Sequence, residues 1–393
     1  MRQLFPFRYT GLRARRLFDD RVLTTLSNTF HTRAISGCGS PGREHVGRRV
    51  VAIANPLPAD AIRRAEDAFI AADVGGTHVR IGLVRGSGDP GAPVSVLEYR
   101  KYVCADHAGL GDIVGDFLAR LGPARATRAV IASAGYALED GTVITNNLPW
   151  RLSPNELRAQ LGFDDVRLVN DFEAVAHAAA QMDASEVLQL AGPAIAPKHG
   201  PTLILGPGTG LGAAVWIPTG KRAVVLATEA GQAALTAGNA LEMALLTEML
   251  KTRTHVPVEQ ALSGPGLMNL HAALCAVRGA APSTYARPGD ITAAALSGSD
   301  PMARESLDVF CGLLGSVVGD MALLYGVQGG VYLAGGILPK IRDFLIQSSF
   351  VPRFLNKGSM REALERIPVK LVEHGQLGVI GAARWYLDHD DGN

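Results

Sequence analysis

An apolar run leads into a glycine turn early in the chain, and after the turn apolar residues alternate with other residues at a period of two. The segments 69–74 and 78–84 flank Gly75-Gly76-Thr77 and predict a strand, a tight turn and a second strand. The same arrangement returns at 202–217, where the stretch from Gly206 to Gly212 separates two apolar runs. The repetition predicts an internally duplicated architecture with one phosphate-facing loop in each half.

Other segments space their apolar residues at i, i+3 and i+4, which is typical of amphipathic helices. This spacing predicts helices at 110–121, 240–250, 266–277, 302–324 and 377–387, and shorter apolar runs predict strands at 94–103, 129–135, 166–171 and 330–337. Strands separated by helices indicate an α/β fold. The strands 129–135 and 166–171 end in small or polar residues, at the edge where open α/β sheets bind their ligands.

Composition narrows the class of protein. The chain has 393 residues, of which 47% are apolar and 19% are charged, so it can bury the cores of two or three domains. Its four cysteines are widely separated and form no Cys-x-x-Cys pair, which argues against a structural zinc site or a disulfide framework. We therefore expect the cysteines to be reduced thiols. No run of about 18 apolar residues is free of charges and glycine clusters, so we expect no membrane-spanning segment.

The charge is unevenly distributed along the chain. Residues 1–50 hold ten arginines against three acidic residues, a net charge of +7, whereas residues 51–393 hold 28 basic against 34 acidic residues, a net charge of −6. The first 40 residues lack the continuous apolar core of a secretory signal, so export is not indicated. We expect residues 1–67 to be a basic, disordered N-terminal extension; a transit peptide and a nucleic-acid-binding arm are the alternatives.

The glycine turns suggest phosphate chemistry. Glycines allow backbone N–H groups to approach a phosphate without obstruction by Cβ atoms, although each turn taken alone can also belong to a plain hairpin. Asp73 directly precedes the first turn, where a carboxylate can hold a hydrated Mg²⁺ against phosphates. Gly208, Gly210 and Ala213 fit the dinucleotide pattern GxGxxA, but that pattern requires a helix and the following residues predict a strand. The chain also lacks a P-loop sequence, so both of those phosphate sites are excluded.

Acidic residues near the strand ends are candidates for catalysis and sugar binding. Asp171 ends an apolar strand and can accept the proton of a substrate hydroxyl, while Asn170 donates to a neighbouring hydroxyl. Asp171 also suits the N-cap of the following helix, and the two interpretations are compatible. Glu229 and Glu259 stand beside glycine turns, where a carboxylate either binds sugar hydroxyls or simply faces the solvent.

The order of the motifs is more specific than any one of them. It resembles the order in bacterial glucokinases of the hexokinase/actin-like ATPase superfamily, in the branch without a zinc-binding cysteine cluster. The resemblance covers residues 68–388 and lies in DVGGTHVRIGLV, VNDFEAVAHA, GPGTGLGAA, TEAGQ, EQALSGPGLMNL, YLAGGILPKI and IPVKLVEHGQLGVIGAA. It implies a two-domain hexokinase/actin-like (ribonuclease H-like) α/β fold with a cleft between the lobes. The small domain would be 68–180, completed by a helix at 375–390, and the large domain 181–374.

The resemblance also implies an activity and its residues. It implies ATP-dependent phosphorylation of glucose at the 6-hydroxyl, with Mg²⁺ as cofactor and Asp171 as the general base. The implied sugar ligands are Asn170, Asp171, Glu229, Gln232 and Glu259. The implied ATP-binding residues are Asp73, Gly75, Gly76, Thr77, Gly208, Thr209, Gly210, Gly335 and Gly336, with Asp73 also holding the Mg²⁺ through water.

Two positions depart from the family pattern. The family usually has Glu-Gly-Gly-His in its sugar loop, whereas this chain has Glu229-Ala230-Gly231-Gln232, and Tyr136 stands where the family tends to have proline. Hexose specificity is therefore open, and a kinase for glucosamine or mannose, or a sugar-sensing regulator with the same fold, are the alternatives. The expected partners are a sugar and ATP, not a membrane or nucleic acid. The resemblance favours a cytoplasmic location and allows a homodimer.

Overall fold

The computed structural model describes residues 67–390, except 89–92, 123–125, 138–142, 145–147, 149, 180–181, 183–185, 195–199, 221–222 and 374. The basic extension predicted at 1–67 therefore lies outside the described residues, apart from Asp67. Every candidate site residue predicted from the sequence is described.

Five strands form the first sheet. They are β1 (Phe69–Val74), β2 (His78–Gly86), β3 (Val94–Val103), β4 (Arg128–Ser133) and β7 (Asp165–Asn170), in the order β3-β2-β1-β4-β7. β1 pairs with β2 in antiparallel fashion across the first glycine turn, whereas β1, β4 and β7 run parallel to one another. The predicted hairpin at 69–84 is confirmed.

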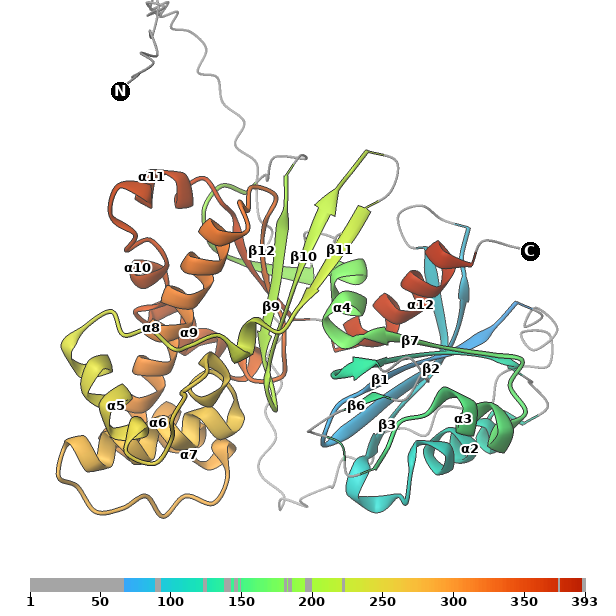
Figure 1. The fold of residues 1–393 in the computed structure, drawn as a ribbon, viewed down its shortest axis with the longest axis horizontal. Coiled ribbons are helices and arrows are strands. Elements are labelled where there is room, and N and C mark those ends of the chain that lie inside the picture. The colour runs from blue at the N-terminus through green and yellow to red at the C-terminus, as the bar shows by residue number, and fades with distance from the viewer. Residues whose placement is uncertain are drawn as a thin grey trace, which may run out of the picture. The chain divides into compact units, whose positions relative to one another are not determined.

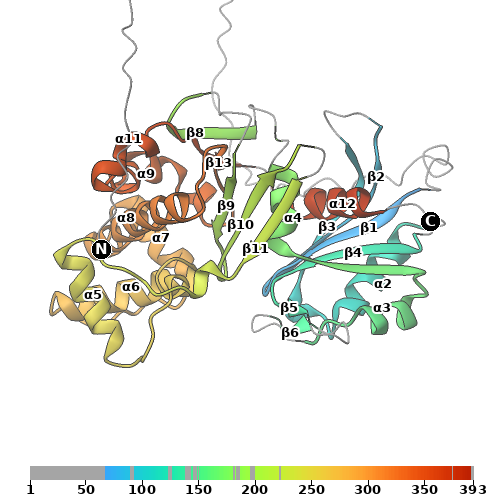
Figure 2. The same cartoon turned by 45° about the horizontal axis from the view of Figure 1, so that its top comes forward.

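Alternate residues of β1 explain how helices cover both faces of this sheet. Phe69 and Ala71 pack with α12 (Leu377–His389), whereas Ile70 and Ala72 pack in a separate cluster. That second cluster includes side chains of α2 (Leu110–Arg120) and α3 (Pro154–Leu161). Figures 1 and 2 show α12 on one side of the sheet and the other two helices on the opposite side. The C-terminal helix thus completes the first half of the fold.

Six strands form the second sheet, which repeats the first. They are β11 (Ala223–Thr228), β10 (Leu211–Pro218), β9 (Thr202–Pro207), β12 (Gly330–Leu333), β13 (Val369–Val372) and β8 (Val187–Ala191), in that order. The β9–β10 hairpin corresponds to β1–β2, and β12 pairs in parallel with β9 as β4 does with β1. The predicted duplication and α/β fold class are confirmed, with β8 as an additional edge strand.

One face of the second sheet is covered by the helices of the C-terminal half. Leu203 and Leu205 of β9 pack with this helical layer, which forms a large apolar core. The layer comprises α5 (Ala240–Leu250), α6 (Gly264–Val277), α7 (Pro288–Ser297), α8 (Pro301–Leu324), α9 (Arg342–Gln347), α10 (Phe350–Phe354) and α11 (Arg361–Leu364). Among the described residues only α8 is long and apolar enough to cross a membrane, and 78% of its most apolar window is buried inside the structure. That degree of burial is typical of a core helix.

The opposite face of the second sheet contacts α4 (Asp171–Ala179), which directly follows β7 of the first sheet. Ala176 and Ala179 of α4 pack against Ile204 and Ala214 of β9 and β10. α12 lies along α4, and Gly381 allows this approach because a Cβ there would overlap the Ala174 carbonyl. α4 is therefore the element that connects the two sheets (Figure 1).

Short elements complete the described structure. They are the two-stranded β5 (Tyr136–Ala137) and β6 (Val143–Ile144), and the 3-10 helices η1 (Cys104–Asp106), η3 (Ala230–Gln232), η4 (Val258–Gln260), η5 (Leu338–Ile341) and η6 (Gly358–Met360). The strand predicted at 330–337 is too long, because β12 ends at Leu333. Gly335 has a φ of 101°, which ends the extended backbone.

Candidate active site

The parallel strands of the first sheet bring the candidate residues to one edge. Val74 of β1 pairs with Ser133 of β4, and Ser133 pairs with Asn170 of β7. Asp73 and Asn170 therefore lie at the carboxyl ends of strands separated by one strand, as ligand-binding residues of open α/β sheets do. The sequence prediction that 129–135 and 166–171 deliver small and polar residues to this edge is confirmed.

Asn170 caps α4, and Asp171 is the first residue of that helix. Oδ1 of Asn170 accepts hydrogen bonds from the backbone N–H groups of Phe172 (3.0 Å) and Glu173 (3.1 Å). Oδ1 of Asp171 accepts from the Phe172 N–H at 2.9 Å. The N-cap prediction for Asp171 is therefore wrong by one residue, because the Asn170 amide already satisfies the free N–H groups of the first turn. The Nδ2 group of Asn170 and Oδ2 of Asp171 are the polar atoms with which this pair can bind a substrate.

Asp171 interacts electrostatically with two other acidic side chains, Asp73 and Glu229. Burial, together with the negative charges of Asp73 and Glu229, raises its pKa to about 7, against the opposing effect of the Phe172 N–H. The pKa of Asp73 is also raised by burial, and this effect is opposed by Arg80, whose Nη1 donates to Oδ2 of Asp73 at 3.0 Å. A carboxylate with a pKa close to neutrality is suited to general-base catalysis. The structure thus brings Asp73, Asp171 and Glu229 together from three distant segments.

The residues around Asp73 are compatible with Mg²⁺ held through water. Oxygen ligands suit this ion, which retains several waters and is commonly shared between one carboxylate and substrate phosphates. No group of three or more His, Cys, Asp or Glu side chains arranged to hold a metal occurs among the described residues. Asp73 offers one carboxylate, of which Oδ2 accepts from Arg80, so a Mg²⁺ ion bound here would need water and phosphate oxygens as its other ligands.

The first glycine turn is held from behind by a residue that the sequence analysis missed. The backbone N–H of Cys104 donates to the Thr77 carbonyl at 3.0 Å, and its thiol donates to the Gly75 carbonyl at 3.2 Å. The thiol is buried, and a lone cysteine 30 residues downstream carries no sequence signal for such a contact. Both bonds hold the backbone carbonyls of Gly75 and Thr77 in place and so fix the shape of the turn.

Basic side chains surround the same turn. The imidazole of His78 is hydrogen-bonded to Oγ1 of Thr77 at 3.1 Å. Burial lowers the pKa of His78, and the nearby positive charges of Lys101, Arg80 and Lys340 lower it further. A region of positive potential beside a glycine turn favours the binding of anionic phosphates.

The second glycine turn contains glycines with different roles. Gly208 has open space where a Cβ would lie, so a ligand can approach its backbone. A Cβ on Gly210 would instead overlap Oε2 of Glu259, and that same oxygen accepts the N–H of Leu211 at 2.9 Å. Gly208 thus leaves space for a ligand, although its own N–H donates to the Gly210 carbonyl at 2.7 Å, whereas Gly210 provides space for a carboxylate that is predicted to bind sugar.

The predicted sugar loop is connected to this turn through Glu259. Nε2 of Gln232 donates to Oε1 of Glu259 at 3.4 Å, and His255 donates to the Gln232 carbonyl at 3.0 Å. Gly231 is needed because a Cβ would overlap the Leu211 carbonyl. Glu229 is exposed at the beginning of this loop. The structure therefore places Gln232 beside Glu259, and both beside the glycine turn at Leu211.

The glycine pair that follows β12 is also divided in its role. Gly335 has a positive φ, and a Cβ there would contact the Pro207 carbonyl, so the fold itself requires glycine at this position. Gly336 is exposed with open space around it, which leaves the backbone accessible to a ligand.

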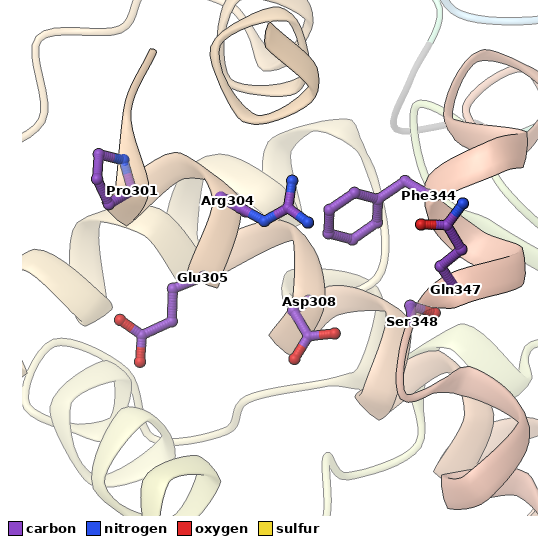
Figure 3. A pocket seen from close by; sticks show the side chains of 7 residues that line it. All are labelled: Pro301, Arg304, Glu305, Asp308, Phe344, Gln347 and Ser348. Atoms are coloured by element: carbon purple, nitrogen blue, oxygen red, sulfur yellow. The ribbon is translucent and has the colours of Figure 1, made fainter. Parts of the chain in front are cut away.

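Figure 3 shows a separate surface pocket between α8 and α9, where Arg304 lies over the Phe344 ring at 5.3 Å. None of the candidate site residues lines that pocket.

Two sheets of the same strand order, each beginning with a glycine-turn hairpin, define the class of protein as the actin-like ATPase fold to which sugar kinases belong. A family model described as Glucokinase matches residues 70–389. The chain therefore belongs to the glucokinase family and is a sugar kinase.

Individual relatives agree with the family assignment. The chain is 56% identical over 321 residues to a glucokinase-like protein of Xylella fastidiosa (strain 9a5c), covering 81% of this chain and 95% of the relative. It is 38% identical over 317 residues to a glucokinase of Saccharophagus degradans (strain 2-40), and the match covers 81% of this chain and 97% of the relative. The crystal structure of a glucokinase from an Antarctic psychrotroph superposes with a TM-score of 0.71 at 33% identity, and the match covers 82% of this chain and 99% of that chain.

Proposed function

We propose that the protein transfers the γ-phosphoryl group of ATP to the 6-hydroxyl of glucose, giving glucose 6-phosphate and ADP. The observation that carries this proposal is Asp171, whose carboxyl has a pKa of about 7 and lies at the start of α4 beside Asp73 and Glu229. In the proposed reaction the oxygen of the sugar 6-hydroxyl attacks the γ-phosphorus of ATP, while Oδ2 of Asp171 accepts the proton of that hydroxyl. Nδ2 of Asn170 donates to a neighbouring hydroxyl and orients the sugar.

The proposed ATP site lies between the glycine turns. Gly75, Gly76 and Thr77 of the first turn and Gly208, Thr209 and Gly210 of the second would contact the phosphates, and Gly335 and Gly336 would lie beside the adenosine. Asp73, oriented by Arg80, would hold Mg²⁺ through water. When bound, the ion neutralises charge on the phosphates. The cations Lys101 and Lys340 add to the positive potential at the first turn.

The proposed sugar ligands besides Asn170 and Asp171 are Glu229, Gln232 and Glu259. The Gln232 to Glu259 hydrogen bond supports the view that the amide replaces the usual histidine as a donor in this loop. Because an amide and an imidazole reach different distances, a kinase for glucosamine or mannose is the second candidate. We also propose that the lobes correspond to 68–180 with 375–390, and to 181–374, and that the enzyme acts in the cytoplasm.

Initial rates of ADP release with ATP and a panel of hexoses test the proposal. We expect glucose to have the highest kcat/KM, ahead of mannose and glucosamine. Comparable or better values for those sugars would favour the second candidate. No hexose-dependent ADP release at all would favour a sugar-sensing regulator.

Asp171→Asn is the matched catalytic variant. We expect glucose binding within about tenfold of the unsubstituted protein, because the amide keeps the shape of the side chain and its bond from Phe172. Turnover should fall by a factor on the order of 10² or more, as expected for loss of a general base. Calorimetry and single-turnover kinetics measure the two effects separately, and near-normal turnover would refute the assignment of the base.

A further inference from the structure

Gly212, the second residue of β10, has no room for a side chain because the ring of Phe172 fills that space. A Cβ on Gly212 would overlap two ring carbons of Phe172 and would lie 2.7 Å from a third, Cγ. Gly212 follows the proposed ATP-side turn, whereas Phe172 follows the proposed base. The contact therefore joins the start of α4, which follows the first sheet, to β10 of the second sheet.

The backbone of Phe172 holds both members of the Asn170-Asp171 pair. Its single N–H donates to Oδ1 of Asn170 at 3.0 Å and to Oδ1 of Asp171 at 2.9 Å. The Phe172 ring packs in the cluster that contains Ile204 and Ala214 of the second sheet. A displacement of the ring that moves the Phe172 backbone therefore also moves the hydrogen bonds of the two side chains.

We propose that Phe172 and Gly212 are positioning residues, and that their contact makes the location of the ATP-side hairpin set the geometry of the sugar-side base. This inference rests on the proposed function and adds a coupling between its two halves. Under it, residue 212 is glycine in order to seat the Phe172 ring. Gly208 differs in having open space around its Cβ position, and the proposed function places it beside the phosphates of ATP.

The physical reason is the steep dependence of proton transfer on distance. A general base must lie within about 2.6–3.2 Å of the oxygen that it deprotonates. A displacement of about 1 Å in a catalytic group can cost roughly 10²-fold in rate. A methyl group forced into a packed contact moves side chains or backbone, because protein interiors have few voids.

The test compares four variants in steady-state assays with glucose and ATP. Gly212→Ala should lower kcat by about 10- to 100-fold and raise the KM for glucose, with the KM for ATP changed by less than about twofold. Gly208→Ala, the same substitution in the turn that precedes β10, should instead raise the KM for ATP. Phe172→Ala should lower kcat about tenfold because the ring support is lost.

The double variant Gly212→Ala/Phe172→Ala decides whether the two residues act through their contact. We expect it to retain the kcat of Phe172→Ala, since the new methyl group then meets no ring. A kcat reduced by the product of the two single effects would overturn the inference. So would a Gly212→Ala variant whose main defect is a higher KM for ATP.

Thermal unfolding establishes that each variant is folded. If Gly212→Ala does not fold, Phe172→Ala still tests the inference, and a normal kcat in that variant would overturn it. Failure of the proposed function is seen separately, as an unsubstituted protein that phosphorylates no hexose. In that case hexose binding by calorimetry replaces kcat: Gly212→Ala must weaken binding in the natural background and not in the Phe172→Ala background.

Discussion

The carboxyl group of Asp171 is ionised at the expense of folding stability. Its pKa of about 7 in the folded protein lies above the ordinary value of 3.8, because burial and neighbouring carboxylates disfavour the charged form. An acid with a raised pKa binds its proton more tightly in the folded state. Its contribution to stability is therefore largest at low pH and is lost as the pH rises from about 4 through about 7.

Asp171→Asn should consequently make the ligand-free protein more stable at pH 8. We expect a gain in unfolding free energy on the order of 2 to 4 kcal/mol at this pH, falling to nearly zero at about pH 2, which lies well below both pKa values, so that the aspartic acid is neutral in both states. Denaturant unfolding at several pH values measures it. Asp343→Asn is the control, since that side chain is 87% exposed and should change stability by less than about 0.5 kcal/mol. A variant that is less stable than the parent at pH 8 would contradict this account.

At the scale of elements, α12 supports the site from behind the first sheet. Gly378, the second residue of this helix, faces Asp73, and a Cβ at 378 would lie 2.5 Å from Cγ of Asp73. In the same helix, Nε1 of Trp385 donates a hydrogen bond to Oε1 of Glu173 at 2.8 Å. Asp388 is hydrogen-bonded through Oδ2 to Nδ1 of His177 at 3.2 Å, and Glu173 and His177 both belong to α4. α12 thereby contacts both the residue proposed to hold Mg²⁺ and the helix that carries the base.

Gly378→Ala should displace the Asp73 carboxylate. We expect the KM for MgATP to rise about tenfold and kcat to fall by a similar factor, with glucose binding little changed, because the effect enters through the ATP side. Gly289→Ala is the control: Gly289 is the second residue of α7 and has open space at its Cβ position. Unaltered MgATP kinetics in a folded Gly378→Ala protein would show that Asp73 tolerates the methyl group.

At the scale of the whole molecule, the described chemistry lies in the acidic part of the chain. The first candidate residue is Asp73 and the family match begins at residue 70, whereas the net charge of +7 belongs to residues 1–50. Deleting residues 1–60 should therefore leave kcat and both KM values within about twofold of the full chain. Steady-state assays of the soluble, folded truncated protein measure this. A large loss of activity would assign the basic segment a part in catalysis.

Hydrophobic periodicity predicted both hairpins, the parallel strands other than β13 and five of the helices, because alternation and helical spacing are local properties that burial imposes on a sequence. The resemblance carried by the motif order predicted the site residues, of which the structure brings Asp73, Asp171 and Glu229 together. The shorter elements β8, β13 and α9–α11 were missed, since segments of four to six residues depend on their partners for stability.

Local sequence does not distinguish one glycine from another. Gly208 and Gly336 have open space around them, whereas Gly210, Gly212 and Gly378 seat the side chains of Glu259, Phe172 and Asp73. These partners are between 40 and 305 residues away in the chain, so the need for glycine follows from packing between the sheets and α12, not from turn geometry. The pKa of Asp171 has the same origin, because burial and the charges of Asp73 and Glu229 exist only once β1, α4 and the loop after β11 have come together.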